Sequence, residues 1–262
     1  MTRSEGSMRC ITPDIPWRND PAPAPQARMS KPTKSAPKSV SSRSAARPAR
    51  RAAGAKTRSP DATKQDIIEV ATREFAQNGL SGARVDEIAA KTGSSKRMIY
   101  YYFGDKDGLY LAVLEEAYRK VRTTEAQLDI EHLRPADALR RLVEFTFDHH
   151  HSNEAFIRLV MIENIHHGDY LARSKTIQEL NVSAIGELER IYQRGLQQGV
   201  FRKGLSAIDL HWQISALCFF NVSNRATFSQ IFRVDLASKK AVAALRAQVV
   251  EMVLRNVLKA PG

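Results

Sequence analysis

The segment RVDEIAAKTGSSKRMIYYYF, residues 84–103, most constrains the fold of this chain, because it predicts two short helices joined by a turn. Val85 and Ile88 place apolar groups on one face of the first helix, which is predicted to end at Gly93 because glycine readily adopts the left-handed conformation. Ser95 is typical of a residue that caps a second helix, since its hydroxyl can accept a hydrogen bond from a free backbone N–H. Because the second helix is basic and aromatic, the pattern predicts a helix-turn-helix that lies on DNA.

The second predicted helix, residues 95–102, divides into a packed face and an exposed face. Ile99 and Tyr102 are three residues apart and are predicted to pack on the first helix, which leaves basic and tyrosine side chains exposed. Lysine and arginine supply charge and paired donors, and phenol hydroxyls donate to phosphate oxygens. The predicted DNA-contacting residues are Arg84, Ser95, Lys96, Arg97, Met98, Tyr100, Tyr101 and Lys106.

These side chains are expected to have different roles. We expect Arg97 and Tyr101 to read base edges, because they lie on the outward face of the helix. Tyr100 and Lys106 are expected to hold phosphates, and Met98 to contact a thymine methyl group. Loss of a base-reading side chain should therefore change sequence preference, whereas loss of a phosphate contact should weaken binding to all sequences.

A set of apolar, glycine, aromatic and polar residues around this segment carries a family resemblance. Its members are Ile68, Ala71, Phe75, Gly79, Gly82, Val85, Ile88, Ala89, Gly93, Ser95, Ile99, Tyr100, Tyr102, Phe103, Lys106 and Leu109. In these residues the chain resembles the tetracycline-repressor (TetR) family of bacterial transcription regulators. The resemblance implies an all-α fold, with a three-helix DNA-binding domain before a helical ligand-binding and dimerisation domain. It also implies a homodimeric repressor that binds double-stranded DNA at a palindromic operator and is released by a small-molecule effector.

Charge is distributed unevenly and predicts three parts: a disordered basic tail over 1–60, a helix-turn-helix DNA-binding domain over 61–105, and a helical effector-binding and dimerisation domain over 106–262. The tail holds 13 Lys and Arg against 3 Asp and Glu, which is +10 of the formal net charge of +12, and 9 of the 11 prolines. Such a segment buries too little apolar surface to offset chain entropy. It can bind any DNA electrostatically, so an architectural or nonspecific DNA-binding protein is the alternative function. Met29 is a second candidate start, which leaves open whether 1–28 are translated.

Periodicity and capping residues predict helices along the rest of the chain, with no strand-like alternation. Thr63 and Asp66 are expected to cap the first helix, and Asp105 the fourth. Besides the helix-turn-helix, the predicted helices cover residues 63–78, 106–126, 135–151, 153–167, 171–198, 206–223 and 237–259. The last two carry apolar faces and are expected to pair as a four-helix bundle between two copies.

The helical half also contains histidines and charged residues that are candidates for an effector site. The predicted ligand-binding residues are Phe147, His151, Arg158, Glu163, His166 and Phe220. Three interpretations are open: an anion paired with Arg158 and a histidine, a transition metal, or histidines that are solvated or satisfied by their neighbours. Residues that can wall an apolar pocket, or more simply pack in the core, are Phe156, Met161, Trp212, Phe219 and Phe220.

Several function classes lack support in the sequence. A metal-dependent enzyme using the histidines is a third hypothesis, but no HExxH, zinc-ligand, phosphate-loop or GxGxxG spacing occurs, so no catalytic residue, metal or cofactor is predicted. The two cysteines, Cys10 and Cys218, indicate a reducing compartment without structural disulfides. No apolar run is long enough for a membrane span and no secretory signal is visible, so the expected location is the cytoplasm, without a membrane partner.

Overall fold

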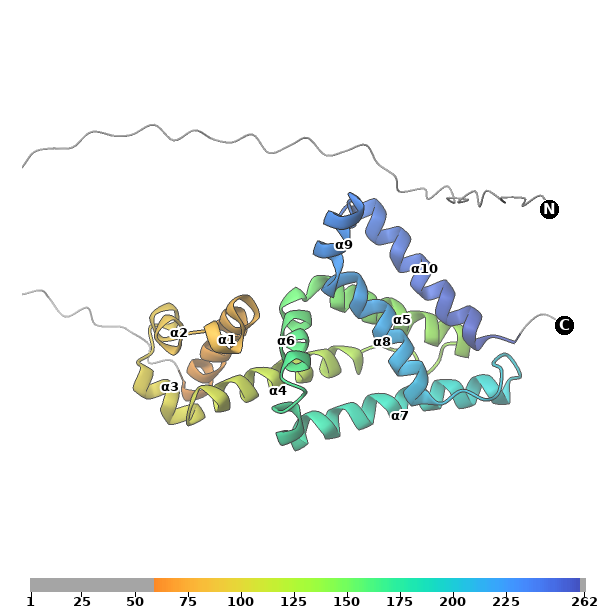
Figure 1. Ribbon diagram of the computed structural model, residues 1–262. Coiled ribbons are helices and arrows are strands. Elements are labelled where there is room, and N and C mark those ends of the chain that lie inside the picture. The colour runs from red at the N-terminus through yellow and green to blue at the C-terminus, as the bar shows by residue number, and fades with distance from the viewer. Residues whose placement is uncertain (1–58, 260–262) are drawn as a thin grey trace, which may run out of the picture.

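The computed structural model describes residues 59–259, and Figure 1 shows that they form an assembly of helices. Apart from an isolated bridge between Phe201 and Leu258, every regular element of these residues is helical. The predicted all-α class is therefore confirmed. Residues 1–58 of the predicted basic tail, including Cys10, lie outside the described part of the chain.

Three helices form the N-terminal unit: α1 (Pro60–Gly82), α2 (Val85–Thr92) and α3 (Lys96–Phe103). The predicted capping of α1 by Thr63 and Asp66 is wrong, because Ser59 is the N-cap. Its hydroxyl accepts a hydrogen bond from the Ala62 N–H, and the Thr63 hydroxyl donates to the Ser59 carbonyl from within the helix. The expected stop near Asn78 is a kink inside α1, where Gly79 has a φ of 72°.

One apolar core holds these helices against the first half of α4 (Lys106–Glu125). Phe75 of α1, Ile88 of α2 and Ile99 of α3 are buried in it. The buried ring of Tyr110 on α4 packs edge-on against Phe75, with ring centroids 5.0 Å apart. Each such side chain contributes about 1.5–3 kcal/mol on burial, so the core fixes the angle at which α3 is presented.

The remaining helices are α5 (Pro135–Ser152), α6 (Glu154–Ile165), the short 3-10 helix η1 (Leu171–Arg173), α7 (Lys175–Gln197), α8 (Ala207–Ser223), α9 (Arg225–Phe232) and α10 (Lys239–Val257). The predicted start of α7 at Leu171 is wrong. Ser174 caps the helix instead, since its hydroxyl accepts a hydrogen bond from the Ile177 N–H. The sequence pattern does not predict α9 as a separate helix.

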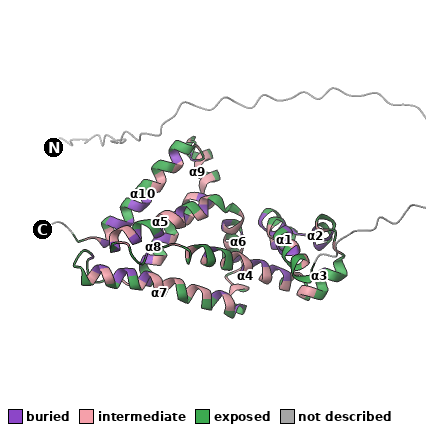
Figure 2. Ribbon diagram, turned by 180° about the vertical axis from the view of Figure 1, so that it is seen from behind, coloured by how far each residue is buried: buried purple, intermediate pink, exposed green. Residues whose placement is uncertain are grey.

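A second apolar core lies between α5, α7, α8 and α10. In Figure 1, α5 and α8 lie between α7 and α10, and Figure 2 shows buried residues along these helices. Leu139 of α5, Ile191 of α7 and Val253 of α10 are among its buried side chains. This core is the larger of the two and carries most of the C-terminal half of the chain.

Helix α6 joins the two halves by packing on α1. Leu159 of α6 is completely buried in the first core, and the Arg158 guanidinium donates a hydrogen bond to the Ala76 carbonyl of α1. Ile177 of α7 belongs to the same core. Packing is therefore continuous across residue 105, and the domain boundary drawn there stays a prediction.

Candidate nucleic-acid interface and ligand cavity

Helix α3 presents a basic and aromatic surface at one end of the molecule (Figure 1). Ile99 is completely buried and Tyr102 is half-buried, so the side of the helix predicted to pack is the side that packs. The exposed residues of α3 and its N-cap are Ser95, Lys96, Arg97, Met98, Tyr100 and Tyr101. Tyr101 is 80% exposed and has its phenol free to reach a partner molecule.

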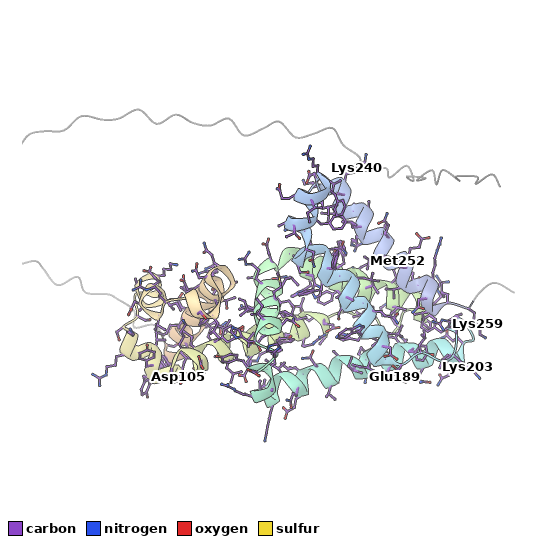
Figure 3. The ribbon with its side chains drawn as sticks, viewed as in Figure 1. Asp105, Glu189, Lys203, Lys240, Met252 and Lys259 are labelled. Atoms are coloured by element: carbon purple, nitrogen blue, oxygen red, sulfur yellow. The ribbon has the colours of Figure 1, made fainter. Side chains whose placement is uncertain are left out.

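Two local caps set the position of this surface. The Ser95 hydroxyl accepts a hydrogen bond from the Met98 N–H at 3.1 Å, which confirms the predicted start of α3. Asp105, labelled in Figure 3 between α3 and α4, accepts one from the Gly108 N–H at 2.7 Å and confirms the predicted cap of α4. Helix α4 therefore begins directly beside the exposed helix.

The charged residues of this surface differ in how firmly the protein holds them. The Lys96 ammonium lies 3.0 Å from the Asp86 carboxylate, which raises the lysine pKa, and 5.9 Å from the Tyr100 ring centroid. Arg97 is exposed and forms no ion pair within the described part of the chain. Arg97 is thus the cation on α3 with the greatest freedom to reach a ligand.

Arg84 and Lys106 flank α3 in the chain. Arg84 is exposed, and its carbonyl accepts the first helical hydrogen bond of α2, from the Ile88 N–H at 3.2 Å. The Lys106 ammonium donates to the Ser81 carbonyl at 3.2 Å. Part of the donor capacity of Lys106 therefore ties α4 to the end of α1, and its other N–H groups stay available for a phosphate.

An ion pair between the buried Glu74 carboxylate and the exposed Lys91, which the sequence analysis did not identify, connects α2 to α1. The Glu74 carboxylate is 4% exposed and accepts hydrogen bonds from the Lys91 ammonium and the Asn78 amide, each at 2.7 Å. The bond from Lys91 lowers the pKa of Glu74, although burial opposes it. The sequence does indicate that Glu74 is buried, because it follows Ile67 and Ala71 at helical spacing on the face that packs.

A cavity of about 880 Å³ opens among α4, α5, α6, η1, α7 and α8 in the C-terminal half. Its apolar walls include Phe156, Val160, Met161, Ile165, Trp212 and Phe219. Four of the five residues considered for an apolar pocket therefore line it. Tyr118 and Arg122 of α4 also line the cavity, so the helix that begins beside α3 forms one of its walls.

The polar part of the cavity wall centres on Arg122. Its Nε and Nη2 atoms donate to the Asn181 side-chain oxygen at 3.2 and 2.8 Å, and Nη1 bonds to Glu125. Burial is the main cause that lowers the pKa values of His150 and His211 to about 4 each. The positive charge of Arg122 contributes to both pKa shifts in the same direction. Both imidazoles are therefore neutral near pH 7.

The six residues predicted to bind a ligand are not among those that line this cavity. Phe147 is buried in the second core, with its ring stacked on that of His151 at 6.4 Å between centroids. The Phe220 ring is 53% exposed and contacts Phe228. These three are held by packing on α5, α8 and α9, which a histidine-rich sequence run does not reveal.

The other three predicted ligand residues join elements of the fold. Arg158 is bonded to α1, as described above. Glu163 is 1% exposed and accepts a hydrogen bond from the Leu171 N–H at 3.2 Å. The His166 ring lies edge-on to Tyr170, with centroids 6.2 Å apart. Arg158 is thus engaged with α1 and does not line the cavity, whose wall contains a different arginine, Arg122.

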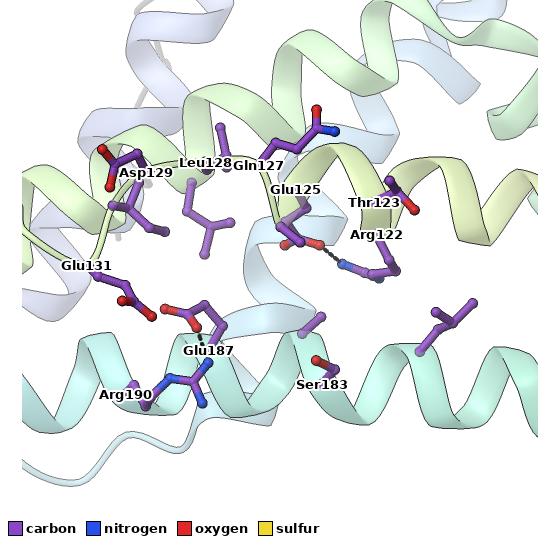
Figure 4. Close-up of a pocket in the computed structure, with 15 residues that line it drawn as sticks. Arg122, Thr123, Glu125, Gln127, Leu128, Asp129, Glu131, Ser183, Glu187 and Arg190 are labelled. Atoms are coloured by element: carbon purple, nitrogen blue, oxygen red, sulfur yellow. Dashed lines mark hydrogen bonds and ion pairs between the residues drawn. The ribbon is translucent and has the colours of Figure 1, made fainter.

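A second cavity, of about 760 Å³, shares Arg122 with the first. Figure 4 shows the Arg122–Glu125 and Glu187–Arg190 pairs that line it. Its charged residues are Arg122, Glu125, Asp129, Glu131, Glu187 and Arg190. Four carboxylates against two guanidinium groups give this cavity an acidic character.

Two other kinds of feature are absent from residues 59–259. No group of three or more His, Cys, Asp or Glu there is placed to hold a metal ion. None of the helices in this part of the chain is long and apolar enough to cross a membrane. Burial raises the pKa of the Cys218 thiol to about 12, which leaves it unreactive.

Comparison with known proteins accounts for both halves of the chain. Residues 67–113 match the family described as bacterial regulatory proteins, tetR family, and residues 135–253 match the tetracyclin repressor-like C-terminal domain. The chain is also 34% identical over 206 residues to the HTH-type transcriptional repressor NicS of Pseudomonas putida, a match that covers 79% of this chain and 97% of that one. The chain belongs to the tetR family of bacterial regulatory proteins.

Solved structures of transcriptional regulators share the fold. The transcriptional regulator SCO4942 of Streptomyces coelicolor, 26% identical, superposes with a TM-score of 0.58 over 74% of this chain and 98% of that one. FadR of Bacillus subtilis, solved in complex with stearoyl-CoA and 20% identical, superposes with a TM-score of 0.56 over 73% and 98%. The predicted function class, a helix-turn-helix transcriptional repressor, is confirmed at this level.

Proposed function

We propose that this protein represses transcription as a homodimer, that it binds a palindromic operator by placing α3 of each copy in the major groove, and that a small molecule in the 880 Å³ cavity releases it. The observation that carries the proposal is the continuity of α4. This helix begins at the cap beside α3 and supplies Tyr118 and Arg122 to the cavity wall. A ligand that moves α4 therefore moves α3.

The contacts to DNA are assigned to the exposed face of α3 and its flanks. Arg97 and Tyr101 are proposed to read bases, and Tyr100 and Lys106 to hold phosphates. Lys96 is proposed as a weaker contact, because Asp86 competes for its ammonium group. An operator on bacterial DNA would place the protein in the cytoplasm.

Dimerisation is supported by an exposed apolar stripe along α8. Ile208, Trp212, Ala216 and Phe220 are all exposed and recur at four-residue spacing, which places them on one face. A second copy packed on this face would bury it and bring a second α3 into reach of the next half-site, roughly 34 Å away. The neighbouring helix α10 is proposed to complete the four-helix interface.

Selection of bound fragments from random DNA tests the proposal. We expect a two-fold symmetric sequence that the full-length protein binds more tightly than unrelated DNA of the same length. The symmetric site should also be preferred by protein that lacks residues 1–58. Equal affinity for all sequences, lost on removal of this basic segment, would instead support the alternative of a nonspecific DNA-binding protein.

A further inference from the structure

The wall of the 880 Å³ cavity has charge of one sign. Of the described residues that line it, none is Asp or Glu, and Arg122 is the one permanent cation. The two histidines of the wall, His150 and His211, are neutral near pH 7 and bring no negative charge. A cationic ligand would therefore find no carboxylate on the wall, whereas an anionic ligand would find the Arg122 guanidinium, whose charge Glu125 compensates from outside this cavity.

The Arg122 guanidinium forms hydrogen bonds that a ligand can replace. Two of its nitrogens share a single neutral acceptor, the Asn181 amide oxygen, while the third bonds to Glu125. The side chain of Arg122 is 14% exposed, so its charge is only partly screened by water. A carboxylate offers two oxygens and forms shorter, stronger bonds to a guanidinium than one amide oxygen does.

We propose that the effector is a monoanion with a mainly apolar body, that its anionic group binds Arg122 in place of Asn181, and that its body lies against Phe156 and Phe219. This inference rests on the proposed function, since it names the class of molecule that the cavity senses. The second cavity beside Arg122 does not compete for such a ligand, because its carboxylates outnumber its guanidinium groups.

The exchange at Arg122 gives the anionic group a direct effect on α4. The bonds from Arg122 to Asn181 connect α4 to α7, and a second connection is the hydrogen bond from the Ser174 hydroxyl to Glu115 at 2.7 Å. A ligand that binds Arg122 in place of Asn181 breaks the Arg122–Asn181 connection and leaves the Ser174–Glu115 hydrogen bond intact. Helix α4 can then pivot on the Glu115 contact, so the charge of the ligand is transmitted along α4.

Three probes with the same apolar body test the charge preference: phenylbutyrate, phenylbutanol and phenylbutylamine, titrated into full-length protein and followed by calorimetry. We expect phenylbutyrate to bind about tenfold more tightly than the alcohol, and the amine to bind most weakly. Equal or tighter binding of the alcohol or the amine would overturn the proposal. This comparison needs no variant, so it decides the question even if substitutions unfold the protein.

A matched pair of variants on α4 assigns the preference to one residue. Arg122→Gln should remove the advantage of phenylbutyrate over phenylbutanol. Arg119→Gln should retain it, because Arg119 is bonded to Glu116 and does not line the cavity. Circular dichroism establishes that both variants are folded. A full preference in folded Arg122→Gln would show that another site binds the anion.

Failure of this inference is distinguishable from failure of the proposed function. The ligand order is measured without DNA, and operator binding is measured without ligand. Operator-specific binding combined with a preference for the amine would overturn the ligand class alone. A preference for phenylbutyrate in a protein that lacks any operator would overturn the proposed function alone.

Discussion

Arg97 is the residue for which the structure makes the clearest prediction about DNA. It is exposed on α3 and, within residues 59–259, has no ion-pair partner that would compete with a base. Arg97→Ala should weaken binding to the selected operator by about 1–3 kcal/mol and relax the preference at one base pair, while nonspecific binding changes little. Fluorescence anisotropy with the operator and with single-base variants of it measures both effects.

Arg73→Ala is the matched control for this experiment, because Arg73 is an exposed arginine of α1 that pairs with Glu69. It should leave operator preference unchanged. If Arg97→Ala instead weakened binding to every sequence equally, Arg97 would be a phosphate contact and the face of α3 that enters the groove would differ from the one proposed.

For single residues, interactions between near neighbours in the sequence could be predicted, and interactions between residues far apart in the sequence could not. Ser95 and Asp105 were assignable as caps because each bonds to a residue three positions further on. The partners of Glu74, Arg158 and Arg122 lie 17, 82 and 59 positions away. Such pairs depend on how the helices pack, and a single sequence contains no direct signal for them.

Among the elements, α7 contains two glycines with opposite expected effects. A Cβ atom at Gly195 would lie 2.0 Å from Cδ2 of Phe201, so Gly195→Ala must displace that buried ring and should cost about 1–3 kcal/mol. A Cβ atom at Gly186 meets nothing within 4 Å, and Gly186→Ala should stabilise the helix by about 0.5–1 kcal/mol. Urea denaturation of the two variants measures the difference, and equal stability would show that Phe201 has room to move.

Helix positions followed largely from periodicity, and the errors have specific causes. The start of α7 depends on whether Leu171 or Lys175 begins the helix, and only the hydroxyl of Ser174 decides it. Helix α9 buries none of its eight residues and has no side-chain cap, so neither an apolar stripe nor a capping residue marks it in the sequence. The aromatic wall of the cavity was predicted in part, but its polar residues were not, because the wall comes from six separate elements, whereas the histidine run on α5 drew the prediction to one segment.

For the molecule as a whole, the buried His150 and the partly buried His211 predict a loss of stability in mild acid. His150 and His211 have pKa values near 4 in the folded protein against a reference value of 6.5. As the pH falls below 6.5 the unfolded chain takes up protons that the folded protein does not, so the free energy of unfolding decreases. The loss at pH 5 should be about 2 kcal/mol for each histidine.

Urea denaturation at pH 7 and pH 5 measures this effect. The double variant His150→Asn, His211→Asn should show a clearly smaller change between the two pH values. His132→Asn should behave as the parent protein, because the His132 side chain is 62% exposed. An undiminished acid sensitivity in the double variant would mean that other groups are responsible.

The assembly state is predicted to depend on the stripe along α8. Phe220→Glu places a charge in that stripe and should convert the dimer to a monomer, because a buried unpaired carboxylate costs several kcal/mol. Val182→Glu introduces the same charge at a 73% exposed position of α7 and should leave the dimer intact. Sedimentation velocity at micromolar concentration distinguishes the two, and a dimeric Phe220→Glu protein would place the interface elsewhere.

Helix α4 has 20 residues, so it is about 30 Å long and turns by about 100° at each residue. Removing a single residue from its middle would shorten it by about 1.5 Å and rotate the DNA-reading end by that same angle relative to the cavity. Hybrid regulators that join the N-terminal unit of this protein to the cavity of another family member must therefore preserve the residue count of α4. The connecting loops between later helices can change length without such a penalty.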